Sequence, residues 1–207
     1  MIDTAAALAH FKSNDVVMAK LLEAALKGTA PLFIPTPKKS DEYFGSIVSS
    51  IVSQQISVHA ARAIKGRVQE ALGELTPEAV IAIRFETLKA CGLSEKKTSY
   101  MKHNAEIWHT IPTKNFVHMT DEEIISELTK LYGIGRWTAE MFLMFSLARP
   151  DVFSYGDLGL MQSLYKKYQY KPHYNRKIAN TVDSWSPHRT IASLTLWHTK
   201  DNLPTIQ

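Results

Sequence analysis

The sequence is poor in the residue that builds disulfides and many metal sites. Cys91 is the single cysteine among 207 residues. One thiol forms no internal disulfide, and it falls short of the ligand sets of a cysteine-rich zinc site or an iron–sulfur cluster. We therefore expect a protein of a reducing compartment that carries no metal and no cofactor.

The sequence also lacks long apolar runs and a targeting signal. No stretch approaches the roughly 18 consecutive apolar residues of a membrane span. The N-terminal segment MIDTAAALAHFKSNDV has no charged region followed by an apolar core, which a secretory signal would have. We therefore expect a protein that is neither secreted nor inserted in a membrane.

Acidic residues are scarce in one part of the chain. The formal net charge of the whole chain is only +4. Residues 161–200 nevertheless contain one acid, Asp183, against the basic residues Lys166, Lys167, Lys171, Arg176, Lys177, Arg189 and Lys200. Such a basic segment favours an anionic partner, although a solvated helical face would carry the same charges.

Alternating strand patterns are almost absent, whereas helical patterns follow one another along the chain. Hydrophobic residues make up 45% and charged residues 21%, the balance of a folded globular protein. An apolar stripe of Leu21, Leu22, Ala25 and Leu26 ends at Gly28. The expected helix caps are Thr4, Asp15, Thr76 ahead of Pro77, and Thr120 in a capping box with Glu123, and the last helix is expected to begin at Ser186 and Pro187. These patterns predict an all-α fold.

The stretch LYGIGRWTAEMF, residues 131–142, interrupts a helical region with two glycines. Gly133 and Gly135 permit positive φ and close approach of the backbone to another body. If that body is a phosphate, the N–H groups of the turn and of the following helix point at it, supported by the helix dipole. A tight turn between two helices would explain the glycines equally well.

Asp157 follows this hairpin within DVFSYGDLGL, at the expected N-terminus of another helix. Helix N-capping is the simplest role for an aspartate at this position. Together, however, the hairpin and the aspartate resemble the helix-hairpin-helix DNA glycosylases of the HhH-GPD superfamily. The sequence is most similar to the alkylpurine branch, the 3-methyladenine DNA glycosylases of bacteria and fungi.

Several segments carry this resemblance, in the order in which the family has them. They are IVSSIVSQQISVHAA at 47–61, LYGIGRWTAEMFLMFSLARPDVFSYGDLGL at 131–160 and WSPHRTIASLTLWHT at 185–199, with KACGLSEKKTSYM at 89–101 as a weaker fourth. The resemblance implies a single domain over residues 1–207, built as a compact two-lobed helical bundle with a helix-hairpin-helix motif. The terminal segments 1–40 and 161–207 would pack together, and residues 41–160 would form a central lobe with the hairpin.

The resemblance assigns catalysis to Asp157 and the base pocket to Trp137, Met141 and Trp197. In the family the matching aspartate stabilises positive charge on the deoxyribose and orients or activates the attacking water. A carboxylate suits an oxocarbenium-like transition state. The face of an indole attracts a cationic alkylated base by about 0.5 to 2 kcal/mol. Core packing is the alternative for each tryptophan.

The resemblance also implies a set of DNA contacts. Gln54 and Gln55 match the minor-groove loop, with Gln55 aligned to the wedge that enters the base stack. Simple solvation of an exposed turn would explain paired glutamines without DNA. The other expected DNA-binding residues are Ser57, Gly133, Ile134, Gly135, Arg136 and Thr138.

Three positions depart from the family pattern. Trp137 occupies the place of the catalytic lysine of the bifunctional branches, so no lyase step is expected. Ser154 stands where a proline often precedes the aspartate. Together with Met141 in place of a pocket aromatic, this change could loosen the pocket.

We expect a monofunctional DNA glycosylase that flips alkylated purines, such as 3-methyladenine and 7-methylguanine, and hydrolyses their N-glycosidic bond. The alternatives are a catalytically weak relative that binds lesions such as abasic sites, and an all-α module for protein contact. The expected partner is double-stranded DNA with alkylated bases or abasic sites, and no membrane. We expect a monomer, located in the nucleus of a eukaryote or in the bacterial cytoplasm and nucleoid.

Overall fold

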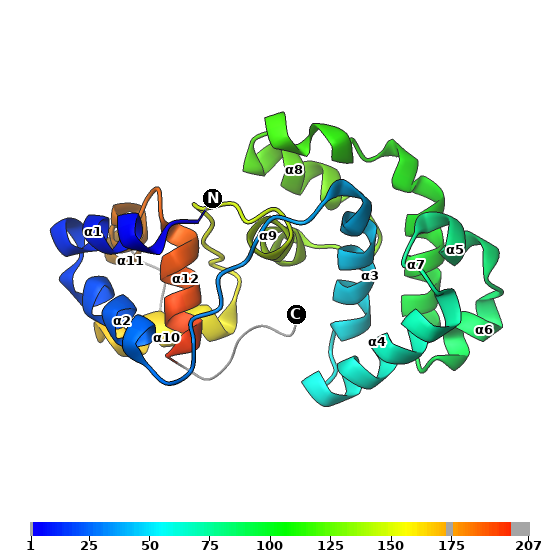
Figure 1. The fold of residues 1–207 in the computed structure, drawn as a ribbon, viewed down its shortest axis with the longest axis horizontal. Coiled ribbons are helices and arrows are strands. Elements are labelled where there is room, and N and C mark those ends of the chain that lie inside the picture. The colour runs from blue at the N-terminus through cyan, green and yellow to red at the C-terminus, as the bar shows by residue number, and fades with distance from the viewer. Residues whose placement is uncertain (1, 173–175, 200–207) are drawn as a thin grey trace. The chain divides into compact units, whose positions relative to one another are not determined.

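The computed structural model describes residues 2–172 and 176–199, and within these ranges the chain forms helices and loops without a strand. The all-α prediction is confirmed. None of the helices in these ranges is long and apolar enough to cross a membrane. The chain divides into a terminal unit, Met1–Pro37 with Leu143–Pro204, and a central unit, Lys38–Phe142 (Figure 1).

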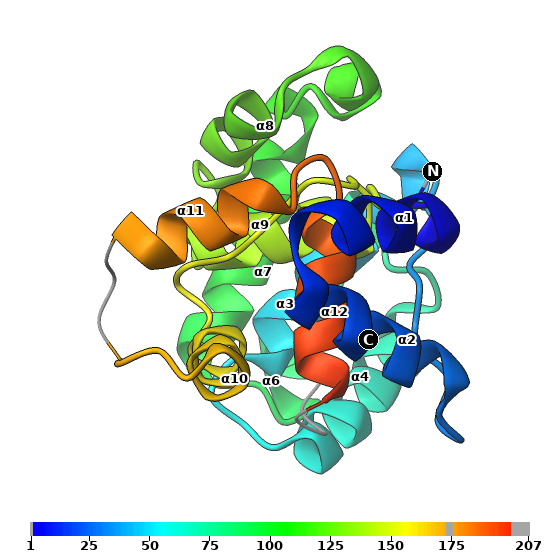
Figure 2. The same ribbon diagram turned by 90° about the vertical axis from the view of Figure 1, so that its left-hand side faces the viewer.

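The terminal unit joins the two ends of the chain. Its helices are α1 (Thr4–Asn14), α2 (Val16–Lys27), α10 (Leu158–Tyr168), α11 (Arg176–Ser184) and α12 (Arg189–His198). Helix α12 packs against both α2 and α10 and lies between them in Figure 2. Asp15 Oδ2 accepts hydrogen bonds from Tyr168 Oη at 2.7 Å and Trp185 Nε1 at 2.8 Å. Polar contacts therefore link α2 to the C-terminal part of this unit.

The central unit is built around α7. Its helices are η1 (Ser40–Glu42), α3 (Tyr43–Ser53), α4 (Val58–Leu72), α5 (Pro77–Ala82), α6 (Phe85–Ala90), α7 (Glu95–Ile107), η2 (Trp108–Thr110), η3 (Thr113–His118) and α8 (Asp121–Leu128). Helix α7 packs against α3, α5 and α6, and Figure 1 shows it alongside α3. Helix α9 (Arg136–Phe145) begins in this unit and continues into the terminal unit.

Residues 143–160 belong to the terminal unit, whereas the sequence placed them in the central lobe. The cause is a set of hydrogen bonds to the start of α12. Val152 N–H donates to Thr190 Oγ1 at 3.0 Å, and Thr190 N–H donates to Pro150 O at 3.0 Å. The sequence holds no local signal for these contacts, because their partners lie about 40 residues apart. Residues 200–207 of the expected terminal segment, including Lys200, lie outside the described residues.

Most of the expected helix caps are present. Thr76 and Thr120 accept hydrogen bonds from the N–H groups of Ala79 and Glu123, and Thr120 with Glu123 forms the expected capping box. Asp15 caps α2 through the N–H of Met18.

One expected helix cap and one expected helix start are wrong. Asp3, not Thr4, caps α1, because its carboxylate accepts from the N–H groups of Ala5 and Ala6. Helix α12 begins at Arg189 instead of at Ser186 and Pro187. The hydroxyl of Ser186 donates to Asp151 at 2.7 Å, so it is committed to another loop and not to a cap.

Cys91 lies in the interior of the central unit, with 6% of its surface exposed. Its thiol donates to Arg67 O and Thr87 O, each at 3.6 Å. Burial raises the pKa of the Cys91 thiol above its usual value, so the thiol stays protonated and poorly nucleophilic.

Candidate functional site

Asp157 is the N-cap of α10, as its sequence position predicts. Its Oδ1 accepts a hydrogen bond from the Leu160 N–H at 2.6 Å. Capping alone does not require burial of the side chain, yet only 7% of the surface of Asp157 is exposed. Burial of a carboxylate is costly without hydrogen bonds, so further donors are required at this position.

Trp197 supplies one such donor from α12. Its indole Nε1 lies 3.2 Å from Asp157 Oδ1, and the tryptophan itself is 1% exposed. Gly159 leaves room for this pair, because a Cβ atom there would stand 3.2 Å from Asp157 Oδ1 and 3.9 Å from Trp197 Nε1. Trp197, which the sequence placed in the base pocket, is thus a buried hydrogen-bond partner of the candidate catalytic carboxylate. A base-pocket role for Trp197 stays a prediction.

The hairpin between α8 and α9 is a constrained turn. Gly133 has φ +78°, and a Cβ at this position would run into the ring of Tyr100. Asn104 of α7 binds both main-chain polar groups of Tyr132, the residue before Gly133. Its Nδ2 donates to Tyr132 O at 2.9 Å, and its Oδ1 accepts from the Tyr132 N–H at 2.8 Å. Helix α7 therefore holds the hairpin backbone through Tyr100 and Asn104.

The second expected DNA-binding segment is the loop Gln54–Ser57 after α3. Gln55 is exposed and has φ +57°, in the left-handed region, and Ser57 caps α4 through the Ala60 N–H at 3.2 Å. Gln54 Nε2 donates to Gly133 O at 2.8 Å. The structure therefore joins the loop and the hairpin, which the sequence separates by about 80 residues.

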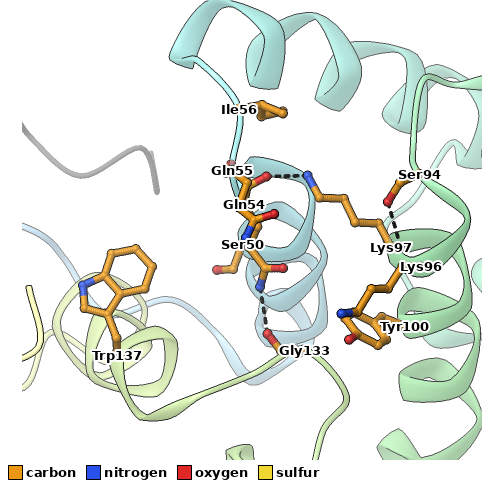
Figure 3. A pocket seen from close by; sticks show the side chains of 11 residues that line it. Ser50, Gln54, Gln55, Ile56, Ser94, Lys96, Lys97, Tyr100, Gly133 and Trp137 are labelled. Carbon is orange, nitrogen blue, oxygen red and sulfur yellow. Dashed lines mark hydrogen bonds between the residues drawn. The ribbon is translucent and has the colours of Figure 1, made fainter.

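A cavity of about 510 Å³ opens beside this junction (Figure 3). The glutamine loop, the start of α7 and the hairpin line it, and Trp137 stands at its edge with 36% of its surface exposed. Figure 3 shows Trp137 and Lys97 on opposite sides of the loop. A second hollow, of about 570 Å³, lies over the hairpin backbone from Thr129 to Gly135. Polar, basic and aromatic groups thus surround two concave surfaces within the central unit.

Three other expected residues of this region are buried. Ile134, Thr138 and Met141 have 5%, 5% and 0% of their surface exposed. The Ile134 N–H donates within the turn, to Leu131 O at 3.2 Å. Met141 lies in the interior and does not line the cavity, and its base-pocket role stays a prediction.

Arg136, at the start of α9, is exposed but paired with two acids. Its guanidinium donates to Glu122 through Nη1 at 2.9 Å and to Glu140 through Nε at 3.0 Å. These contacts raise the pKa of Arg136 and lower the pKa of Glu122. Arg136 therefore offers less net positive charge to DNA than its sequence position suggests.

The basic segment of the terminal unit is partly committed to protein contacts. Arg189 pairs with Asp183 at 3.1 Å and with Asp151 at 3.6 Å, and Lys177 lies over the ring of Tyr170 at 4.8 Å. Lys166, Lys171 and Arg176 are exposed. Among residues 2–172 and 176–199, no group of three or more His, Cys, Asp or Glu side chains is arranged to hold a metal ion.

Lys97 of α7 is a residue that sequence reasoning missed. Its ammonium group binds the carbonyl oxygens of Val52 and Gln54 at 2.8 and 2.6 Å. Local sequence patterns carry no sign of a contact across more than 40 residues.

Comparison with known proteins identifies relatives of this arrangement. Residues 48–188 match the family described as HhH-GPD superfamily base excision DNA repair protein. The chain is 36% identical over 166 residues to DNA-3-methyladenine glycosylase 1 of Schizosaccharomyces pombe, over 76% of this chain and 72% of that enzyme. It is 36% identical over 157 residues to DNA-3-methyladenine glycosylase of Saccharomyces cerevisiae, over 69% of this chain but only 52% of that enzyme. The structure of S. pombe Mag1, a 3-methyladenine DNA glycosylase in complex with abasic DNA, superposes with a TM-score of 0.78 and 30% identity, covering 95% of this chain and 97% of Mag1.

Proposed function

Because the chain belongs to the HhH-GPD superfamily of base excision DNA repair proteins, we propose that it is a DNA glycosylase that hydrolyses the N-glycosidic bond of alkylated purines. Its substrate is double-stranded DNA, from which the damaged nucleotide is flipped before the base is released. The relatives named as 3-methyladenine glycosylases support this substrate class.

The observation that carries the proposal is the setting of the Asp157 carboxylate. An N-cap needs only one acceptor for one helix N–H, and an exposed side chain can provide it. Asp157 is instead nearly buried, and its Oδ1 accepts from the Trp197 indole as well as from the Leu160 N–H. Two donors on one oxygen fix the orientation of the carboxylate. A carboxylate held in this way stabilises the positive charge that develops on deoxyribose as the base leaves, and it orients the attacking water.

Alkylation on a ring nitrogen makes the purine a cationic leaving group. Strong protonation of the base is then less necessary, so a second carboxylic acid is not required. The exposed indole of Trp137 supplies an aromatic face for a flipped cationic base. This division of roles favours 3-methyladenine and 7-methylguanine over neutral lesions.

We propose that the enzyme lacks lyase activity and acts as a monomer. A lyase step needs a nucleophilic amine at the sugar, and Trp137 stands at the position where the bifunctional branches carry their lysine. An indole nitrogen forms no Schiff base with the abasic sugar. Release of the base by hydrolysis is therefore the whole reaction.

The central unit supports DNA binding through its backbone. The first N–H groups of α9 follow the hairpin, and a helix N-terminus of this kind binds phosphate without reading sequence. The exposed side chain of Gln55 fills the space of the flipped nucleotide. The joined loop and hairpin thus form one surface for the damaged strand.

The decisive experiment compares the wild type with Asp157→Asn. Each protein is incubated with duplex DNA methylated by an alkylating agent, and released bases are quantified by chromatography. We expect base release by the wild type and a loss of at least about 100-fold in Asp157→Asn, because the amide carries no negative charge at the sugar.

Binding to a duplex with an abasic analogue is measured in parallel. Comparable affinity of both proteins would show that Asp157→Asn leaves the DNA-binding surface intact. If the wild type binds the abasic duplex but releases no base, the protein is a lesion binder and the enzymatic proposal is wrong. Strand cleavage at the abasic product would contradict the absence of lyase activity.

A further inference from the structure

Lys97 connects α7 to the end of α3. The Lys97 ammonium donates to Val52 O at 2.8 Å and to Gln54 O at 2.6 Å, and the side chain is half-buried. The last carbonyl groups of a helix have no donor within the helix, so an ammonium group at this end stabilises it. Partial burial lowers the pKa of the Lys97 ammonium group below its usual value.

The residue that follows these carbonyls has an unfavourable backbone conformation. Gln55 has φ +57°, a region that residues other than glycine adopt only when the surroundings impose it. Gln55 is exposed, so its side chain contributes little to holding this geometry. The peptide that precedes Gln55 is held in place, because Lys97 binds its oxygen (Figure 3).

Gln54 extends the same contact to the hairpin. Its backbone oxygen accepts from Lys97, while its side-chain Nε2 donates to Gly133 O at 2.8 Å. Two further residues on α7, Tyr100 and Asn104, hold the other side of the hairpin. Helix α7 therefore fixes both the loop and the hairpin, and Lys97 is its contact with the loop.

We propose that Lys97 is a positioning residue for lesion recognition, which holds Gln55 in the conformation that enters the base stack and at a set distance from the hairpin. The proposal rests on the proposed function, because Lys97 orients Gln55 for insertion into the base stack of damaged DNA. Lys97 acts through Gln54 and Gln55 and not through contact with the damaged base.

Lys102 is a matched control on the same helix. Its ammonium group donates to Val80 O and Ile81 O at 2.9 Å and to Ile83 O at 2.6 Å, at the end of α5. Like Lys97, it satisfies the C-terminal carbonyls of a neighbouring helix. It does not bind the glutamine loop, so a substitution there removes an equivalent anchor without loosening Gln55.

The test compares Lys97→Met with Lys102→Met, which remove the charge and keep the aliphatic chain. Each variant is checked for folding by circular dichroism. Each is then added at saturating concentration to a duplex with 2-aminopurine beside a tetrahydrofuran abasic analogue, where unstacking of 2-aminopurine raises its fluorescence. We expect the fluorescence rise to fall at least threefold in Lys97→Met and to match the wild type in Lys102→Met.

A double variant separates positioning from general loosening. In a Gln55→Ala background, Lys97→Met should change the remaining signal less than twofold, because Lys97 acts through Gln55. Full additivity of the two losses overturns the proposal, as does a wild-type signal in Lys97→Met. Lys97→Leu is the second variant if Lys97→Met does not fold, and a wild-type signal in it has the same consequence.

The duplex in this assay requires no base release, so its outcome is independent of glycosylase activity. If the wild type unstacks 2-aminopurine but releases no methylated base, the proposed enzymatic function is wrong. The comparison of Lys97→Met with Lys102→Met then still decides the role of Lys97. A wild-type protein that fails to unstack 2-aminopurine overturns the role of Lys97.

Discussion

Trp197 donates its indole N–H to Asp157 Oδ1 at 3.2 Å, across 40 positions in the sequence. The pair unites the start of α10 with α12 in the interior of the terminal unit. A tryptophan that would otherwise be read as a core residue therefore also orients a carboxylate.

Trp197→Phe should slow base release while leaving DNA affinity close to that of the wild type. Loss of the N–H leaves a buried acceptor with one donor fewer and costs about 1 to 3 kcal/mol of stability. The carboxylate then shifts, and a displacement of about 1 Å costs up to about 100-fold in rate. Single-turnover kinetics on methylated DNA measures the effect.

Trp185→Phe is the control for this prediction. Trp185 is equally buried and donates its indole N–H to Asp15 Oδ2 at 2.8 Å in the same unit. It should lose similar stability in chemical denaturation but keep the wild-type rate. Equal rate losses in both variants would mean that Trp197 acts through stability alone.

The two hairpin glycines should respond differently to alanine. Gly133→Ala imposes a positive φ on a residue with Cβ and drives that atom into the Tyr100 ring, so we expect a loss of about 1 to 3 kcal/mol in unfolding free energy. Gly135→Ala meets no atom within 4 Å in the protein. It should leave stability nearly unchanged and weaken duplex binding, because its methyl group would occupy space at the proposed contact with the DNA backbone. Thermal unfolding and fluorescence anisotropy separate the two effects, and equal stability losses would contradict the assignment.

Glu122→Gln should strengthen binding to undamaged DNA by a few fold. Glu122 holds the Arg136 guanidinium at 2.9 Å, and its neutralisation raises the net positive charge next to the hairpin, although Glu140 still binds Arg136 at 3.0 Å. Exposed ion pairs contribute only about 0 to 1 kcal/mol, so stability should change little. The logarithmic salt dependence of binding should steepen by up to about one unit. Glu23→Gln removes the same charge from the pair with Lys12 in the terminal unit, and a matching gain there would show a general charge effect.

Stability should fall in mildly acidic solution because of His188. Burial lowers the pKa of His188, with a contribution from His10, while Asp151 and Asp3 oppose the shift. A histidine whose folded pKa lies below its unfolded value of about 6.5 contributes fully above that pH, and the contribution is lost as the pH falls toward the folded pKa. Denaturation midpoints between pH 7.5 and 5 should drop in the wild type and less in His188→Gln. Parallel pH profiles would exclude His188 as the cause.

Local chemistry in the sequence predicted much of the fold. Helix starts at Asp15, Thr76 and Thr120 depend on a side chain and an N–H three residues away, and all three are present. Leu26 shows the limit of such reasoning, because periodicity alone placed it in the apolar stripe and 45% of its surface is exposed.

The candidate site was predictable only in part, because its contacts join distant segments. Sequence position marked Asp157 as a cap, but no local pattern indicates that Trp197 donates to it. Lys97 is similar, since its acceptors are main-chain carbonyls that any sequence would supply. Backbone geometry decides such contacts, and it becomes visible only when the helices are assembled.

The burial of the Cys91 thiol has a consequence for the proposed activity on alkylated DNA. Methylating agents modify thiolates readily, and a reactive cysteine near the DNA surface would consume the reagent at the cost of the enzyme. The chain has a single thiol, which lies inside the central unit and is hydrogen-bonded to main-chain oxygens. Burial raises its pKa and so favours the protonated form. Burial thereby keeps the one thiol of the proposed glycosylase away from methylating agents, whose products in DNA are its proposed substrates.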